Sequence, residues 1–173
     1  MPTSSNKGKK DFLRWLSEIK NINLILDIGC GEGTYPKLLK EKTSINATWY
    51  GVEAWTDYIS EFNLNDLYNV ILNQDAKTID WKALPIFDLV IFGDVLEHMT
   101  KDESITLVSK ALDHSKFVFI SIPIVHSPQG EVNGNPYEVH VKDDWTHEEV
   151  LDTFPFIQKS HVAKKIGIYL LSK

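Results

Sequence analysis

An aspartate and three glycines, evenly spaced, follow the first strongly apolar run of the chain. The run over residues 24–28 has the composition of a strand buried on both faces, and Asp27, Gly29, Gly31 and Gly33 lie at its end. Glycines in such a turn let backbone amides approach a ligand without obstruction by a Cβ atom. Asp27 would repel a phosphate but would attract a cationic amino group. The turn by itself is equally compatible with a strand-to-helix connection that binds nothing.

A second carboxylate follows at the end of the next strand-like run. Glu53 closes the run over residues 49–53 and lies 20 residues after Gly33. In α/β proteins a carboxylate at this place can accept hydrogen bonds from both hydroxyls of a ribose. Taken alone, Glu53 would more simply be a solvated residue at a strand end.

Histidines near the ends of two further strands could act as general bases. His98 lies four residues after Asp94, so on a short helix both side chains share one face beyond the strand over residues 87–92. An imidazole titrates near neutral pH and suits removal of a hydroxyl proton, and Asp94 could orient that hydroxyl, act as the base itself or ligate a metal with a histidine. His126 follows the next strand. We predict His98, Asp94 and His126 as catalytic, against the alternative of hydrogen-bonded structural histidines, and no metal site, because oxygen-rich ligand spacing is absent elsewhere.

Four motifs, in order, resemble those of class I S-adenosylmethionine-dependent methyltransferases. They are the glycine turn with Asp27, the strand ending in Glu53, the stretch 70–76 with Asp75, and the stretch 87–98 with Asp94. The resemblance implies S-adenosylmethionine as cofactor, S-adenosylhomocysteine as product, and a hydrogen bond from the adenine amino group to Asp75, which alone would be a turn-former. The cofactor-binding residues that it implies are Asp27, Gly29, Cys30, Gly31, Gly33, Glu53, Asp75, Ala76, Gly93 and Asp94.

The segment between residues 121 and 145 is long for a connection within a compact domain, which favours a functional loop. Its Asn-Pro-Tyr-x-x-His stretch resembles the acceptor-side insertion of methyltransferases of glycan and small-metabolite pathways. It differs from the Asn-Pro-Pro-Tyr motif of amino-group methyltransferases, because it lacks the second proline and does not directly follow the strand over residues 87–92. We therefore reject the interpretation of the chain as an amino-group methyltransferase of that kind. The alternative is that these residues only build turns and anchor the loop. The predicted substrate-binding residues are His126, Asn135, Tyr137, His140 and Trp145.

Strand and helix patterns alternate along the chain. Asp11 is expected to cap a first helix and Thr34 a second, while periodicity predicts a helix over residues 101–112 and a strand over residues 116–122. A helix near residue 146 and strands over residues 154–159 and 166–171 complete the series. The expected fold is α/β and Rossmann-like, a mostly parallel seven-stranded sheet with a closing antiparallel strand and helices on both faces. We expect a flexible basic tail over residues 1–10 and a single domain over residues 11–173.

Composition excludes several classes of protein. The net charge is −6 with no large basic cluster, so nucleic acid is a poor candidate partner. Cys30 is the single cysteine, which excludes an intramolecular disulfide and a cysteine-based zinc site. No run is apolar enough to span a membrane or to act as a signal peptide, so the expected location is a reducing cytoplasm.

Together these features predict a methyltransferase that acts on oxygen. The favoured acceptor is a sugar hydroxyl on a glycan or glycosylated metabolite, because histidines and a polar, aromatic loop surround the expected acceptor side. The alternatives are a small-molecule carboxylate or amine acceptor, or a non-catalytic cofactor-binding partner or module of a larger protein.

Overall fold

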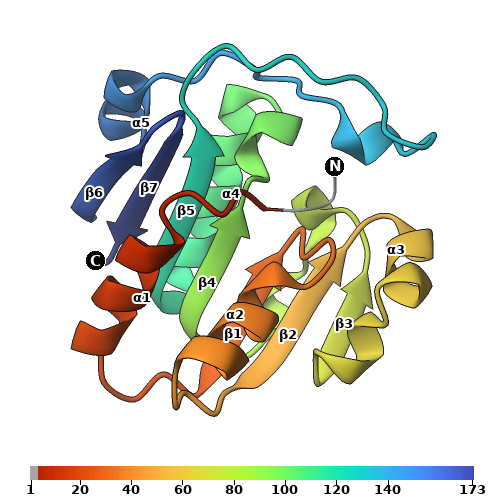
Figure 1. The fold of residues 1–173 in the computed structure, drawn as a ribbon, viewed down its shortest axis with the longest axis vertical. Helices are drawn as coiled ribbons and strands as arrows, with labels where there is room; N and C mark the ends of the chain where they lie inside the picture. The colour runs from red at the N-terminus through yellow and green to blue at the C-terminus, as the bar shows by residue number, and fades with distance from the viewer. Residues whose placement is uncertain (1–3) are drawn as a thin grey trace.

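The computed structural model describes residues 4–173, and in it all seven strands join one sheet (Figure 1). The strand order is β3-β2-β1-β4-β5-β7-β6, in which β7 runs antiparallel to the other six strands. This confirms the predicted mostly parallel sheet with an antiparallel strand near its end. The strands are β1 (Leu24–Ile28), β2 (Thr48–Glu53), β3 (Val70–Asn73), β4 (Phe87–Gly93), β5 (Ser115–Pro123), β6 (Ile157–Ala163) and β7 (Ile166–Leu171).

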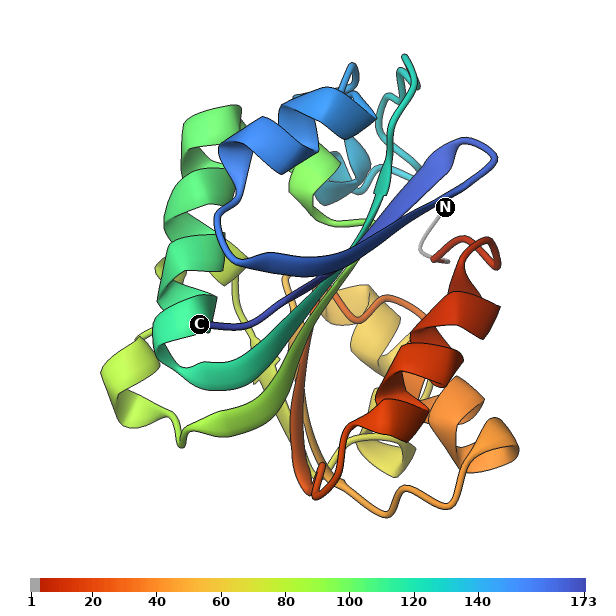
Figure 2. The ribbon, with the colours of Figure 1, turned by 90° about the vertical axis from the view of Figure 1, so that its left-hand side faces the viewer.

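Helices cover both faces of the sheet, as Figure 2 shows in edge-on view. Helices α1, α2 and α3 lie on one side, and α4 and α5 on the other. The α-helices are α1 (Lys9–Glu18), α2 (Thr34–Lys42), α3 (Thr56–Glu61), α4 (Lys101–Asp113) and α5 (His147–Thr153). The short 3-10 helices are η1 (Leu64–Asp66), η2 (Ala76–Thr78), η3 (Trp81–Ala83), η4 (Leu96–His98) and η5 (Pro136–Glu138).

Alternate side chains of the central strands belong to two apolar clusters, one under each helical layer. Leu26, Val90 and Ile120 point to the layer of α4 and α5, whereas Ile25 and Leu89 point to the layer of α1 and α2. This is the period of two that a pleated strand imposes. Burial on both faces explains why these strands are continuous apolar runs in the sequence.

The first two helices begin differently from the prediction. Helix α1 begins at Lys9 with Gly8 as its N-cap, so Asp11 lies inside the first turn, where it pairs with Arg14 at 2.9 Å. Helix α2 has Gly33 at its N-cap, and Thr34 is its first residue rather than its cap. In both cases a glycine with positive φ makes the sharp entry that the sequence pattern assigned to a polar side chain.

The expected tail has two parts. Residues 1–3 lie outside the described residues. Within residues 4–10, Ser4, Gly8 and Lys9 are buried, Asn6, Lys7 and Lys10 are exposed, and α1 has already begun at Lys9. The segment crosses the sheet in front of β4 and β5 (Figure 1), and its flexibility in solution is a separate property.

The chain direction places a crevice at the carboxyl ends of the parallel strands. Connections leave β1 toward β2 on one side and reach β4 on the other, which is the switch point where open α/β sheets bind ligands. The long segment after β5 runs over these strand ends and carries η5 toward the α3 side before it reaches α5 (Figure 1). Within residues 4–173, none of the helices combines the length and apolar character that crossing a membrane requires.

Candidate active site

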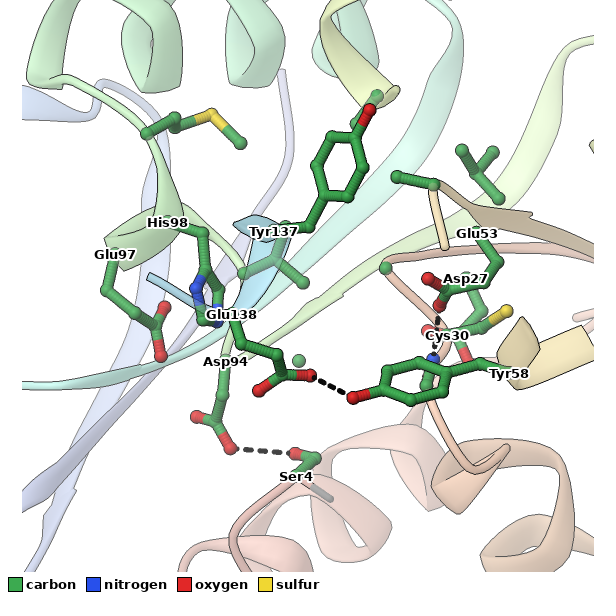
Figure 3. A pocket seen from close by; sticks show the side chains of 18 of the residues that line it. Ser4, Asp27, Cys30, Glu53, Tyr58, Asp94, Glu97, His98, Tyr137 and Glu138 are labelled. Atoms are coloured by element: carbon green, nitrogen blue, oxygen red, sulfur yellow. Dashed lines mark hydrogen bonds between the residues drawn. The ribbon is translucent and has the colours of Figure 1, made fainter. Parts of the chain in front are cut away.

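A cavity of about 350 Å³ lies at this switch point, within the size range of small-molecule sites. Its walls come from the ends of β1 to β4, the segment after β5 and the N-terminal segment. Figure 3 shows its two sides, with Asp27, Cys30 and Glu53 on one and Glu97 and His98 on the other. The site therefore joins segments from both ends of the chain.

The glycine turn forms one wall. Gly29 has a φ of 65°, and a Cβ atom there would lie 2.6 Å from a methyl carbon of Val95, so only glycine fits. The amides of Gly29 and Cys30 donate to the Val52 carbonyl, which holds the turn against β2. Of the predicted turn residues, Gly29, Cys30 and Gly31 line the cavity. Gly33 does not, because it lies behind the turn at the start of α2.

Asp27 is a buried carboxylate on this wall. Burial raises its pKa to about 7, against the opposing effects of a 2.7 Å hydrogen bond from the Tyr68 hydroxyl and the nearby Lys9 ammonium. Such a carboxyl is desolvated and about half protonated near neutral pH, and a cationic ligand would stabilise its ionised form. The binding of a cationic group by Asp27 stays a prediction.

Glu53 lies at the end of β2 and braces the turn. One of its oxygens accepts from the Gly31 amide and the other from the Trp55 amide, both at 2.9 Å. Burial raises the pKa of Glu53, and these two hydrogen bonds oppose the rise. Each oxygen keeps a second lone pair, so the carboxylate can still accept hydroxyl donors from the cavity.

The adjoining wall comes from the end of β3. Asp75 and Ala76 both line the cavity, and the Asp75 side chain caps η2 by accepting from the Lys77 amide at 2.9 Å. Asp75 thus has the turn-forming role that the sequence allowed and faces the cavity as well. Gly93, the last residue of β4, also lines the cavity.

Asp94 lies where β4 ends and is tied to the N-terminal segment. It has a φ of 59° and accepts hydrogen bonds from the Ser4 hydroxyl at 2.9 Å, the Ser5 amide at 2.6 Å and the Ser121 hydroxyl at 3.0 Å. The Lys9 ammonium donates to the Ser4 hydroxyl at 2.7 Å, and burial lowers its pKa to about 8. No sequence pattern indicated a role for Ser4 and Ser5, which were expected to belong to the tail.

His98 and His140 meet at the other end of the cavity. Their ring centroids lie 4.8 Å apart, edge to face. The Nδ1 atom of His98 lies 3.1 Å from the Val139 carbonyl, which can only accept, so Nδ1 carries the proton and Nε2 has the free lone pair. Burial, and secondarily the neighbouring His140, lowers the pKa of His98, so its imidazole is neutral at pH 7. A neutral imidazole facing a ligand cavity can bind a proton or a metal ion.

The segment after β5 contributes four more lining residues, which are Gln129, Asn135, Tyr137 and Glu138. Asn135 is buried and caps η5 by accepting from the Tyr137 amide at 2.9 Å. Glu138 is also buried and accepts from the Tyr58 hydroxyl of α3 at 3.2 Å (Figure 3). Sequence reasoning missed Glu138, Tyr58 and Glu97. Only Glu97 had a signal, as the carboxylate just before His98.

Two predicted residues do not reach the cavity. His126 has a side chain 71% exposed and lies 3.3 Å from Asp143, which draws it to the surface. Trp145 is fully buried in the core under α5, where its ring packs against Phe154. A large apolar ring gains more from the core than from a solvated loop. The predicted roles of His126 and Trp145 at the acceptor side are therefore corrected.

A family sequence model places the chain among known proteins. The model described as methionine biosynthesis protein MetW matches residues 9–125. The chain belongs to the MetW family. The match ends at the end of β5, so it includes the glycine turn, Glu53 and His98 but not the segment with Glu138 and His140. A search of curated proteins finds no sequence match.

Solved structures share the fold of this MetW family member. The N-terminal domain of EvdMO1, crystallised with SAH, has a TM-score of 0.69 and 15% identity, covering 98% of this chain and 83% of that one. An S-adenosylmethionine-dependent methyltransferase from Clostridium acetobutylicum has a TM-score of 0.68 and 12% identity, with coverages of 95% and 89%. Magnesium protoporphyrin IX methyltransferase from Synechocystis, with bound SAM, has a TM-score of 0.66 and 16% identity, with coverages of 95% and 77%. The fold is that of class I methyltransferases, as predicted.

Proposed function

We propose that the chain binds S-adenosylmethionine and transfers its methyl group to an oxygen acceptor. The observation that carries the proposal is a single cavity with Asp27 and Glu53 at one side and the neutral imidazole of His98 at the other. The fold neighbours crystallised with SAM or SAH support the choice of cofactor. In this arrangement Asp27 would receive the cofactor's ammonium group, Glu53 its ribose hydroxyls and Asp75 its adenine amino group.

The transfer itself is a direct displacement. The bond between the methyl carbon and the sulfonium sulfur breaks with its electron pair staying on sulfur, and a bond from the acceptor oxygen to carbon forms. The hydroxyl proton moves to a base in the cavity or to solvent water. A hydroxyl needs activation because its pKa lies far above neutral. His98 is the residue that we assign to that activation, because its Nε2 lone pair is free and its ring lines the cavity.

A sugar hydroxyl is our favoured acceptor. Polar and aromatic groups, among them Tyr137, Asn135 and Glu138, surround the acceptor side and can hydrogen-bond to or stack on a sugar ring. The EvdMO1 domain has also been crystallised in the presence of SAH and D-fucose, which supports the same class. The MetW match ends at residue 125, before these residues, so it does not bear on the choice of acceptor.

Two measurements test the proposal. Calorimetry should detect binding of S-adenosylhomocysteine and none of NAD, whose pyrophosphate Asp27 repels. Transfer of a labelled methyl group to a panel of sugars, amines and carboxylates should favour the sugars. Labelling of amines or carboxylates instead would show that the acceptor belongs to one of those classes. Cofactor binding without any turnover would favour a non-catalytic, cofactor-binding partner.

The variant His98→Ala should keep cofactor affinity and lose roughly 10²–10⁴ in turnover. His126→Ala is the matched control, because its exposed side chain lies outside the cavity, and its turnover should stay unchanged. Normal turnover in His98→Ala would contradict the assigned role.

A further inference from the structure

Three potential metal ligands converge at the acceptor end of the cavity. One ligand atom each from Glu97, His98 and His140 lies within 4.8 Å of the other two. Glu97 and His98 come from η4, where Figure 3 shows their side chains next to each other, whereas His140 comes from the segment after β5. All three residues line the cavity, so an ion held by them would be open to a ligand there.

Both imidazoles have the tautomer that metal ligation through Nε2 requires. Nδ1 of His98 faces the Val139 carbonyl and Nδ1 of His140 faces the Ser127 carbonyl. Because a carbonyl only accepts, each Nδ1 is the protonated nitrogen and each Nε2 keeps its lone pair. Metal-binding histidines in proteins almost always have their second ring nitrogen fixed in this way, which sets the tautomer and the ring orientation.

Backbone hydrogen bonds hold the third ligand in place. The Val141 amide donates to the Glu97 carbonyl at 2.8 Å, and the His140 amide donates to the Gln129 carbonyl at 3.0 Å. The residue after His140 is thereby tied directly to the helix that carries the other two ligands. Such a preset arrangement lowers the cost of assembling a three-ligand site.

Glu97 provides an independent reason to expect a cation. Its side chain is only 2% exposed, and its Oε2 atom has no hydrogen-bond partner among residues 4–173. A buried carboxylate oxygen without a hydrogen-bond partner is costly, and a divalent cation bound to it would offset that cost.

We propose that Glu97, His98 and His140 bind a divalent transition-metal ion. Two imidazoles and one carboxylate suit Mn²⁺, Fe²⁺, Co²⁺ or Zn²⁺ better than Mg²⁺ or Ca²⁺, which prefer all-oxygen sites. Ligands bound at about 2.0–2.2 Å stand roughly 3–4 Å apart, so small rotations of these side chains would close the site. The sequence predicted no metal because oxygen-rich ligand spacing is absent elsewhere. It could not show that His140, from a separate and non-periodic segment, lies beside Glu97 and His98.

The ion would also define the acceptor, and this part rests on the proposed function. Three protein ligands leave coordination positions open, so an acceptor with two adjacent hydroxyls could chelate the ion. Coordination lowers the pKa of a bound hydroxyl, whose proton then leaves to solvent water, and the resulting alkoxide attacks the methyl carbon as the bond to sulfur breaks. The lone pair of His98 then binds the ion, so His98 activates the acceptor through the metal and does not take the proton itself.

Metal binding can be tested without methyl transfer. The full chain, stripped with a chelator, is titrated with Co²⁺ and followed by visible absorption, and with Mn²⁺ followed by electron paramagnetic resonance. We expect one equivalent to bind, with imidazole-dependent absorption bands for Co²⁺. Glu97→Gln and His140→Ala should each weaken binding by about 10–100-fold, and His126→Ala should not change it. Binding of S-adenosylhomocysteine by each variant checks that the fold and the cofactor side are intact.

Absence of one-equivalent binding, or equal binding by the parent, Glu97→Gln and His140→Ala, would overturn the site. The catalytic part has its own measurement. Turnover of a vicinal diol acceptor should fall at least tenfold on chelation and return on addition of metal, and a diol should be a better acceptor than its deoxy analogue. Binding with chelator-resistant turnover would overturn the catalytic part alone. Binding with no turnover on any acceptor would instead contradict the proposed function.

Discussion

The pH dependence of cofactor affinity is the sharpest consequence of the buried Asp27. Burial raises the pKa of this carboxyl to about 7, so it is ionised above that value and becomes protonated as the pH falls through it. A cationic ligand group binds the ionised form, so at lower pH part of the binding free energy is used to remove the proton. From pH 7.0 to pH 5.5, a pKa of 7 gives a loss of affinity of about 15-fold.

Calorimetric titration with S-adenosylhomocysteine at these two pH values measures the effect. Asp27→Asn should bind more weakly at both, by about 1.5–3 kcal/mol for a lost hydrogen bond to a charged group, and with little pH dependence. Tyr68→Phe is the complementary variant, because it removes the 2.7 Å hydrogen bond that favours the ionised form. In this variant the pKa of Asp27 should rise further. The loss of affinity for S-adenosylhomocysteine between pH 7.0 and pH 5.5 should then approach about 30-fold.

Other groups near the cavity also titrate, among them Lys9 and Glu53 next to Asp27 and His98 at the opposite side. Whatever pH dependence they cause remains in Asp27→Asn, so the difference between this variant and the parent isolates Asp27. An equal pH dependence in both proteins would refute the assignment of Asp27 to the ammonium group.

Three further predictions concern the cofactor side and the core. Glu53→Ala should weaken S-adenosylhomocysteine binding by roughly 1.5–3 kcal/mol in calorimetry without unfolding the chain, and unchanged affinity would show that Glu53 does not bind the ribose. Gly93→Ala should cost about 1–3 kcal/mol in urea unfolding because its Cβ would lie 2.2 Å from a tyrosine ring, whereas Gly130→Ala, with nothing within 4 Å, should stay within about 0.5 kcal/mol of the parent. Burial raises the pKa of Asp88, but Lys116 and two backbone amides outweigh it and hold the pKa below the usual 3.8. The free energy of unfolding of Asp88→Ala should therefore be about 1–3 kcal/mol below that of the parent at pH 7. This difference should shrink at low pH, where the carboxyl of the parent becomes protonated, and an equal difference at low pH would contradict the assignment.

The sequence by itself determined the sheet and the cofactor side of the site. Strands buried on both faces must be apolar runs, and β1, β4 and β7 coincide with such runs. Carboxyl ends of parallel strands meet at one edge, so Asp27 and Glu53 had to lie near each other once those strands were recognised. These are consequences of local composition and of a period of two.

Short-range patterns were less informative where partners are distant. Asp88, a charged residue near the start of β4, is buried because the Asn23 and Leu24 amides and the Lys116 ammonium converge on it. The strand expected from residue 154 begins at Ile157, since Phe154 closes α5. Neither outcome follows from the flanking residues alone.

Only the tertiary structure decided the acceptor side. His126 and His140 belong to the same non-periodic segment, and the sequence could not tell which one reaches the cavity. The choice is made by hydrogen bonds between residues far apart in the chain, such as Val141 to the Glu97 carbonyl, while Asp143 draws His126 away. The same holds for Ser4 on Asp94, because contacts of this kind leave no periodic trace in the sequence.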